Sequence, residues 1–320
     1  MRVAVTGAGG RLGTSLRSEL AGRSFVDAIL AWDIPQHDLD DPDSAARLVT
    51  RDFPDVVIHA AAWTDVDGCA RDPRLALRRN GQATGELAAA CAGRGASLIV
   101  VSTNEIFDGE RTDERGYRPD DEPNPINPYG ASKLAGERAA TAAFAAARSS
   151  STGPGGHTTG TTGAEGVAAA AAASQLGIVR TAWLFGPGAP DFPGKILAAA
   201  RRARDAGEPL RAVGDEWGNP TYTVDLARAI VDLVASGRFE GVHHVVNGGR
   251  TNRFAWARNV VESARIDVDV VEVPASTWTR ASNPPRWGVL EPTPLPAGPL
   301  RPWPEAMAEY APDLLARSER

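Results

Sequence analysis

The chain has 320 residues, a formal net charge of −6 and 42% hydrophobic residues, which is typical of a soluble globular protein of one large domain or two coupled ones. The acidic balance, without a basic stripe, gives no indication of nucleic-acid binding, and no apolar run is long enough for a membrane span. The N-terminus carries no signal-peptide pattern, and Cys69 and Cys91 show no metal-ligand spacing, so we expect a cytoplasmic protein without a metal site.

Short apolar strands alternate with helical stretches through the first half of the chain. Strands are predicted at residues 2–6, 28–32, 56–60 and 97–102. Helices are predicted at residues 11–20, 43–51, 75–92 and 129–148. Continuous apolar strands are typical of a parallel sheet covered on both faces, and the alternation indicates βαβ units. The predicted fold class is therefore α/β, with a doubly wound parallel sheet of the Rossmann type.

The second half is less regular. Further strands are predicted at 178–183 and 242–246, and helices at 196–206, 225–235 and 253–264. A stretch of about 149–174 consists almost wholly of Ser, Thr, Gly and Ala, which indicates an inserted surface loop between a helix and a strand. Residues 274–304 are rich in proline and tryptophan, so we expect irregular but packed structure there.

A glycine-rich loop follows the first predicted strand and opens the first predicted helix. Three glycines are spaced G-x-x-G-x-x-G, a pattern that lets the backbone approach a pyrophosphate and directs N–H groups at it. An ordinary tight turn is the alternative, but the strand before and the helix after favour dinucleotide binding. The predicted cofactor contacts in this loop are Gly7, Gly10, Arg11, Leu12 and Gly13.

Two residues near this loop give opposite indications about the dinucleotide. Asp33 ends the second predicted strand, 20 residues after Gly13, where an acidic side chain binds the adenosine ribose of NAD. Arg11 lies inside the loop, where its guanidinium could reach the 2′-phosphate of NADP. The sequence therefore leaves the cofactor open as NADP or NAD.

Tyr129 and Lys133 are four residues apart at the start of a predicted helix, which places them on one face, one turn apart. A tyrosine has a pKa of about 10, and a nearby cation lowers it towards the range useful for proton transfer. We expect Lys133 to supply that charge and to hold the nicotinamide ribose, while Tyr129 exchanges a proton with a carbonyl oxygen. The alternative is an exposed helical pair with a solvated lysine.

Aromatic and cationic side chains gather in the last third of the chain. Indole rings can stack on a nucleotide base, and guanidinium groups suit a diphosphate, so Arg253 and Arg286 are predicted to bind a phosphate-bearing substrate. The alternative is that the tryptophans belong to a core and the arginines to the solvated surface.

Several stretches of the chain together resemble the extended short-chain dehydrogenase/reductase family, and within it the dTDP-4-dehydrorhamnose reductases. The Tyr-Gly-x-Ser-Lys element at 129–133 marks the superfamily, and the Ala-Ala-Ala-Trp-Thr-x-Val-Asp and Gly-Asn-Pro-Thr stretches mark the subfamily. The resemblance covers nearly the whole chain, over residues 59–67, Asn80, 102–109, 127–137, 179–186 and 218–222.

The resemblance implies the roles of several residues. Thr103, Tyr129 and Lys133 would be the catalytic triad, and Trp183 would lie in the sugar-nucleotide pocket. A run of three alanines, Ala60, Ala61 and Ala62, would pass beneath the nicotinamide half of the cofactor. The substrate would be the C4 ketone of a nucleotide-linked 4-keto-6-deoxy sugar, and a homodimer is left open.

The resemblance also implies a Rossmann domain followed by a smaller substrate-binding domain. We place the NAD(P)-binding domain at 1–185, with the helix and strand of 224–247 returning to it. The substrate-binding domain is predicted to comprise 186–223 and 248–320.

One departure from the family pattern concerns the end of the fourth predicted strand, where the chain reads Ser-Thr-Asn-Glu instead of Ser-Thr-Asp-Tyr. The Thr-x-Glu order is similar to that of sugar-nucleotide 4,6-dehydratases, but the Asn104 amide cannot donate a proton as a carboxylic acid does. We expect Asn104 to contact substrate instead. An epimerase or dehydratase of the same superfamily, and a non-catalytic NAD(P)-binding regulatory subunit, remain the alternatives.

Overall fold

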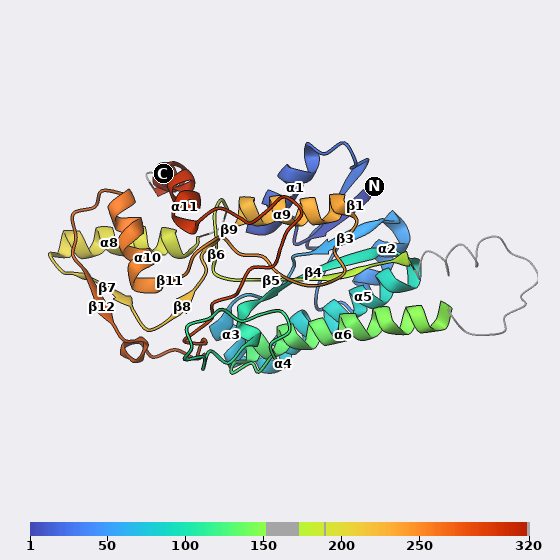
Figure 1. The fold of residues 1–320 in the computed structure, drawn as a ribbon, viewed down its shortest axis with the longest axis horizontal. Helices are drawn as coiled ribbons and strands as arrows, with labels where there is room; N and C mark the ends of the chain where they lie inside the picture. The colour runs from blue at the N-terminus through green and yellow to red at the C-terminus, as the bar shows by residue number, and fades with distance from the viewer. Residues whose placement is uncertain (152–172, 189, 319–320) are drawn as a thin grey trace, which may run out of the picture.

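A computed structural model of the protein describes residues 1–151, 173–188 and 190–318. The described chain forms a larger lobe, which holds the N-terminus, and a smaller lobe with the C-terminal helix (Figure 1). The insertion predicted at about 149–174 falls mostly outside the described residues. Within the described ranges, no helix has the length and apolar character needed to cross a bilayer.

The larger lobe is built on a six-stranded parallel sheet with the order β10-β5-β4-β3-β1-β2. Its strands are β1 (Arg2–Thr6), β2 (Ala28–Trp32), β3 (Val56–His59), β4 (Ser97–Thr103), β5 (Leu176–Thr181) and β10 (Gly241–His244). The chain adds β2 on one side of β1 and the later strands on the other. In open parallel sheets, ligands bind beyond the carboxyl ends of the strands at such a reversal, here between β1 and β3.

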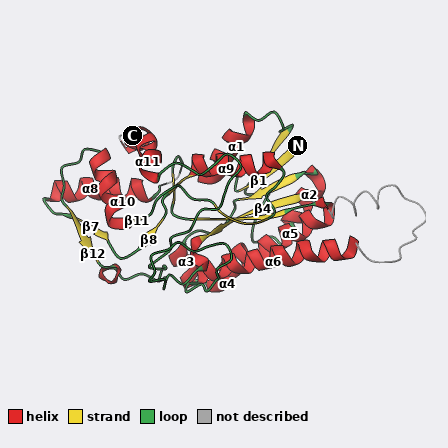
Figure 2. Ribbon diagram, viewed as in Figure 1, coloured by secondary structure: helices red, strands yellow, loops and turns green. Residues whose placement is uncertain are grey.

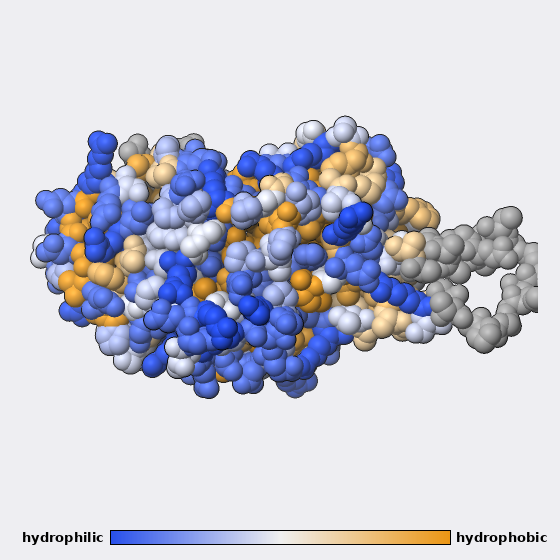
Figure 3. All heavy atoms as spheres, in the orientation of Figure 1, coloured by the Kyte–Doolittle hydropathy of each residue, from blue (hydrophilic) through white to orange (hydrophobic). Residues whose placement is uncertain are grey.

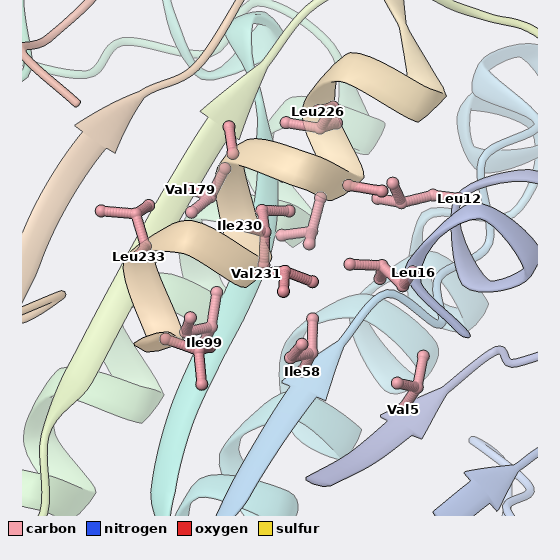
Figure 4. Close-up of a cluster of buried hydrophobic side chains, with 14 of the residues drawn as sticks. Val5, Leu12, Leu16, Ile58, Ile99, Val179, Leu226, Ile230, Val231 and Leu233 are labelled. Carbon is pink, nitrogen blue, oxygen red and sulfur yellow. The ribbon is translucent and has the colours of Figure 1, made fainter. Parts of the chain in front are cut away.

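Helices cover both faces of this sheet (Figure 2), which confirms the predicted doubly wound α/β fold. One face carries α1 (Arg11–Ala21) and α9 (Thr223–Ser236), and the other carries α2 (Ser44–Asp52), α5 (Ala83–Arg94) and α6 (Pro128–Ser151). Aliphatic side chains of α1 and α9 point between the helices and the sheet (Figure 4), among them Leu16, Leu226 and Ile230. Each fully buried aliphatic side chain contributes about 1.5–3 kcal/mol to stability.

The described part of the smaller lobe contains three α-helices, three pairs of short strands and isolated bridges. The helices are α8 (Phe192–Ala206), α10 (Arg253–Ser263) and α11 (Trp303–Ser318). The strand pairs are β7 (Leu210–Val213) with β12 (Val270–Val273), β8 (Trp217–Gly218) with β11 (Thr251–Asn252), and β6 (Leu184–Phe185) with β9 (Thr221–Tyr222). An isolated bridge joins Gly248 to Pro302. The face drawn in Figure 3 is mostly hydrophilic, with apolar side chains in small groups.

Several predicted elements differ from the observed ones. The helix predicted at 75–92 is divided into α4 (Pro73–Ala76), a π-helical segment (Leu77–Gln82) and α5. The strand predicted at 178–183 ends at Thr181, two residues before Trp183, and β10 ends two residues earlier than predicted. Among the described residues, the α-helices α3 (Val66–Arg71) and α11 were not predicted. The sequence also gave no indication of the short strands of the smaller lobe.

Candidate active site

The ends of β1 and β3 are tied together at the reversal of the sheet. The Thr6 hydroxyl accepts a hydrogen bond from the backbone N–H of Ala61 at 3.1 Å, and it lies 2.8 Å from Nδ1 of His59. Burial lowers the pKa of His59 well below its usual value, so this histidine is neutral and acts as a structural link. The glycine loop and the alanine run therefore lie side by side.

The glycine loop fits a dinucleotide for two independent reasons. A Cβ on Gly13 would stand 2.1 Å from the carbonyl oxygen of Gly7, and one on Gly7 would stand 2.9 Å from Cα of Ala61, so side chains are excluded at both positions. Helix α1 begins after Gly10, which offers no side chain as a cap, and the first turn carries no acidic residue. The first N–H groups of the helix thus remain available to a phosphate.

Replacement of Gly13 by alanine is expected to weaken binding of NADPH and NADH by at least about tenfold, since the loop must move away from Gly7. Titration of the protein with each cofactor, followed by calorimetry, measures this effect. Gly22→Ala at the other end of α1 is the matched control, because its Cβ would meet nothing within 4 Å. Equal affinities in the two variants would show that the loop does not bind the dinucleotide.

Three other predicted cofactor residues have defined partners. The Asp33 carboxylate accepts the N–H of Gly9 at 2.5 Å and therefore lies directly on the glycine loop. The Arg11 guanidinium donates to the Gly186 carbonyl at 2.5 Å and pairs with Asp191 at 3.3 Å. It thus links the loop to the smaller lobe, and its contact with a cofactor stays a prediction. The Leu12 side chain belongs to the core, so only its backbone N–H is available to a cofactor.

The segment that follows the three alanines after β3 is held in place by the side chain of Asn80. The Asn80 amide accepts the N–H of Trp63 at 2.8 Å and donates to the Trp63 carbonyl at 3.0 Å and to the Ser132 hydroxyl at 3.1 Å. Asn80 is buried and lies in the π-helical segment. Ala60, Ala61 and Ala62 are half-buried, and Ala61 lies against Gly7; their position beneath the nicotinamide stays a prediction.

Tyr129 lies at the beginning of α6, next to the end of β4. The Asn127 side chain caps this helix by accepting the N–H of Gly130 at 2.8 Å. Burial raises the pKa of the Tyr129 phenol, the charge of Glu105 raises it further, and a hydrogen bond with Thr103 opposes both. The phenol is therefore protonated at neutral pH, which is the form that donates a proton to a carbonyl oxygen.

The expected effect of Lys133 on Tyr129 needs correction. The buried Lys133 ammonium donates to the Val101 carbonyl at 2.8 Å, and burial lowers its pKa to about 8 against the opposing charge of Glu137. The pKa of Tyr129 is raised rather than lowered, because desolvation of the tyrosinate and the Glu105 charge prevail. Lys133 still lies one turn from Tyr129 on α6, where its other N–H bonds can reach a bound ribose.

A cavity of about 550 Å³ lies between the two lobes. Its wall includes Glu216, Arg280 and Arg286 from the smaller lobe, with Asp108 and Ile126 from the larger one. Arg280 donates to Glu216 at 2.8 Å. Arg286 is exposed at this wall, and its contact with a diphosphate stays a prediction.

Trp183 and Arg253 contact each other rather than standing apart. The Arg253 guanidinium lies 4.2 Å from the centre of a Trp183 ring, and Trp256 stacks against Trp183 at 5.8 Å. The indole of Trp183 is thus already in contact with the Arg253 guanidinium, the Trp256 ring and Gly218. These contacts leave little room for a base to stack on it. Trp183 instead forms a platform that holds Arg253.

A segment at residues 274–290 crosses from the smaller lobe over the cavity, and we call it the strap. Three residues of the larger lobe fasten it: Asp67 accepts the N–H and hydroxyl of Ser282, Asn104 donates to the Gly288 carbonyl at 2.8 Å, and Asn127 contacts the carbonyl of Asn283. Asn104 is buried and its amide nitrogen is engaged. Asn104 therefore positions the strap, and its contact with substrate stays a prediction.

Sequence reasoning missed Glu216. Glu216 is only 2% exposed and lies between Arg253 and Arg280. Burial raises the pKa of Glu105, whose carboxylate accepts the Asn127 amide at 2.8 Å. The Glu216 partners lie 37 and 64 residues away in sequence, so no local spacing indicated the cluster.

The chain matches a family model described as the RmlD substrate binding domain over residues 1–151 and 147–315. A dTDP-4-dehydrorhamnose reductase of Mycobacterium tuberculosis is 35% identical, covering 96% of this chain and 91% of its own. The crystal structure of a dTDP-4-dehydrorhamnose reductase from Clostridium acetobutylicum is similar with a TM-score of 0.82 at 28% identity, over 99% of this chain and 100% of that one. The crystal structure of a Bacillus anthracis dTDP-4-dehydrorhamnose reductase in complex with NADP is similar with a TM-score of 0.80 at 27% identity. The match covers 98% of this chain and 99% of that one.

Proposed function

Because the chain belongs to the RmlD substrate binding domain family, we propose that it reduces the C4 ketone of a dTDP-linked 4-keto-6-deoxy sugar. It is an NAD(P)-dependent oxidoreductase, and its cofactor is NADP or NAD. The observation that carries the proposed reduction of a carbonyl is the position of Tyr129. Its phenol lies beside Thr103, at the same edge of the sheet as the glycine loop.

The protein's own residues act on the carbonyl oxygen of the substrate. The nicotinamide, when bound, supplies the hydride. Tyr129 donates its proton to the carbonyl oxygen, and the Thr103 hydroxyl orients the phenol and that oxygen by hydrogen bonding. Lys133 holds the ribose through the N–H bonds that its contact with the Val101 carbonyl leaves over. We assign the catalytic role to these three residues.

Gly7, Gly10 and Gly13 would hold the pyrophosphate, with the N–H groups of Arg11 and Leu12. Asp33 is placed to meet the adenosine ribose. Dehydration is disfavoured because the position of a proton-donating acid is occupied by Asn104, whose amide is engaged by the strap. A homodimer and a cytoplasmic location remain predictions from the sequence.

Replacement of Arg286 by alanine is expected to raise KM for the nucleotide-linked ketosugar by about tenfold, because a charged hydrogen bond to the diphosphate is worth about 1.5–3 kcal/mol. The kcat should change much less, since the diphosphate is remote from the reacting carbon. Arg253→Ala should act in the same direction. Arg118→Ala is a matched control, because Arg118 forms an exposed pair with Glu291.

Steady-state oxidation of NADPH at varied ketosugar concentration measures both constants. An unchanged KM in both variants, or reduction of a free ketosugar as efficiently as the nucleotide-linked one, would contradict the nucleotide-sugar assignment. The assignment as a dehydrogenase would survive either result.

A further inference from the structure

Glu216 is a buried carboxylate that the proposed reaction does not use. Its side chain is 3% exposed, and each of its oxygens accepts one guanidinium N–H. Nε of Arg253 donates to Oε2 at 2.8 Å, and Nη1 of Arg280 donates to Oε1 at 2.8 Å. The Glu216 carboxylate thus pairs with two guanidinium groups at once, and the buried Glu105 carboxylate also interacts electrostatically with both arginines.

The two arginines come from different parts of the smaller lobe. Arg253 is the first residue of α10, and its guanidinium also lies over Trp183 at 4.2 Å and Phe192 at 5.3 Å. Arg280 lies in the strap, between two residues that are held by hydrogen bonds. The N–H of Ala275 donates to Asp215, and the N–H of Ser282 donates to Asp67. Glu216 therefore joins the strap to a rigid helix and fixes the separation of the two guanidinium groups.

In this arrangement, Glu216 accepts only a minority of the N–H donors of the two guanidinium groups. A guanidinium has five N–H bonds, and Glu216 takes one from each arginine. Glu216 and Arg280 both line the cavity, and Arg286 lines it as well. Arginines held apart at a fixed distance suit two linked phosphate groups better than one, because each phosphate can then accept a pair of N–H bonds.

We propose that Glu216 is a positioning residue that orients Arg253 and Arg280 as a clamp for the diphosphate of the substrate. The inference rests on the proposed function, because it assumes a ligand that carries a nucleoside diphosphate. Glu216 does not touch the reacting atoms. Its loss should weaken diphosphate binding and leave the chemical step almost unchanged.

The test compares dTDP and dTMP as ligands of the parent protein and of Glu216→Gln. Glutamine keeps the shape but removes the charge and one acceptor. We expect the Kd for dTDP, measured by calorimetry without cofactor, to rise about tenfold, and the Kd for dTMP to rise less than threefold. In turnover, KM should rise and kcat should stay within about threefold.

Two further variants complete the design. Glu291→Gln removes an exposed ion pair of the same region and should leave both affinities unchanged. If Glu216→Gln lowers the melting temperature, Arg280→Gln serves as the second variant. A double-mutant cycle between the two positions should then show coupled, non-additive losses in dTDP affinity.

The outcomes separate the two claims. Equal dTDP affinity in Glu216→Gln and the parent would overturn the clamp while leaving the proposed function intact. A loss of kcat at unchanged KM would also overturn it. If dTDP does not bind to the parent protein, the nucleotide-sugar proposal fails, and the clamp fails with it.

Discussion

Replacement of Tyr129 by phenylalanine is expected to lower kcat by roughly 10²–10⁴-fold, the contribution usually made by a general acid. The phenol is the proton donor in the proposed reaction, and its raised pKa keeps it protonated at neutral pH. Only the hydroxyl is removed, so α6 and its Asn127 cap should remain in place. The affinity for NADPH should therefore change by less than threefold.

Single-turnover and steady-state rates with the dTDP-linked ketosugar measure this effect, and calorimetry measures NADPH binding. Tyr222→Phe is a control, because Tyr222 lies in the core of the smaller lobe. A kcat for Tyr129→Phe within about threefold of the parent value would remove Tyr129 from the mechanism.

Loss of the buried ion pair between Glu137 and Arg180 is expected to have the largest effect on stability. Both side chains are at most 5% exposed, and their closest atoms are 2.8 Å apart. Glu137 also accepts the Ser102 hydroxyl, and Arg180 donates to the Pro119 carbonyl. Glu137→Gln leaves a buried guanidinium without a counter-charge, so the free energy of unfolding should fall by about 3–5 kcal/mol.

Urea denaturation followed by circular dichroism measures that loss. Glu291→Gln should cost less than about 1 kcal/mol, because its pair with Arg118 is about half exposed. The double variant Glu137→Leu/Arg180→Met should recover part of the stability, since the buried guanidinium is removed together with its carboxylate partner. A loss below 1 kcal/mol in Glu137→Gln would show that solvent reaches the pair.

The sequence predicted those parts of the fold whose signal is local. Strands β1 and β2 have the predicted bounds, because each is a short apolar run flanked by polar residues. The Tyr129–Lys133 spacing and the glycines from Gly7 to Gly13 likewise depend only on neighbours in the chain. Such motifs could be assigned before any contact between distant residues was known.

What escaped prediction depends on partners far apart in sequence. Strands β7 and β12 pair only because the chain folds back over about 60 residues, so neither carries a strong pattern alone. Helix α11 contains Pro312, which interrupts the helical pattern even though the helix continues through it. The prolines in and before this segment therefore concealed the helix from a reading of the sequence alone.

The same limit applies to the site. The position of Arg11 in the loop indicated a side chain that could reach a 2′-phosphate, but it gave no indication of the partner Asp191, which lies 180 residues away. Likewise, the sequence around Trp183 did not indicate that its indole would be covered, because the Arg253 guanidinium and the Trp256 ring that contact it come from α10. Side-chain competition of this kind is decided by tertiary packing, which spacing alone does not report.

The most direct test of the reductase assignment is the transfer of deuterium from cofactor to substrate. The protein is incubated with a dTDP-linked 4-keto-6-deoxy sugar and NADPH deuterated at the transferable C4 position, and the product is examined by mass spectrometry and NMR. The account predicts one NADPH oxidised per sugar reduced, with deuterium on C4 of the product sugar. Conversion of the sugar without oxidation of NADPH, as an epimerase or dehydratase would give, would contradict it.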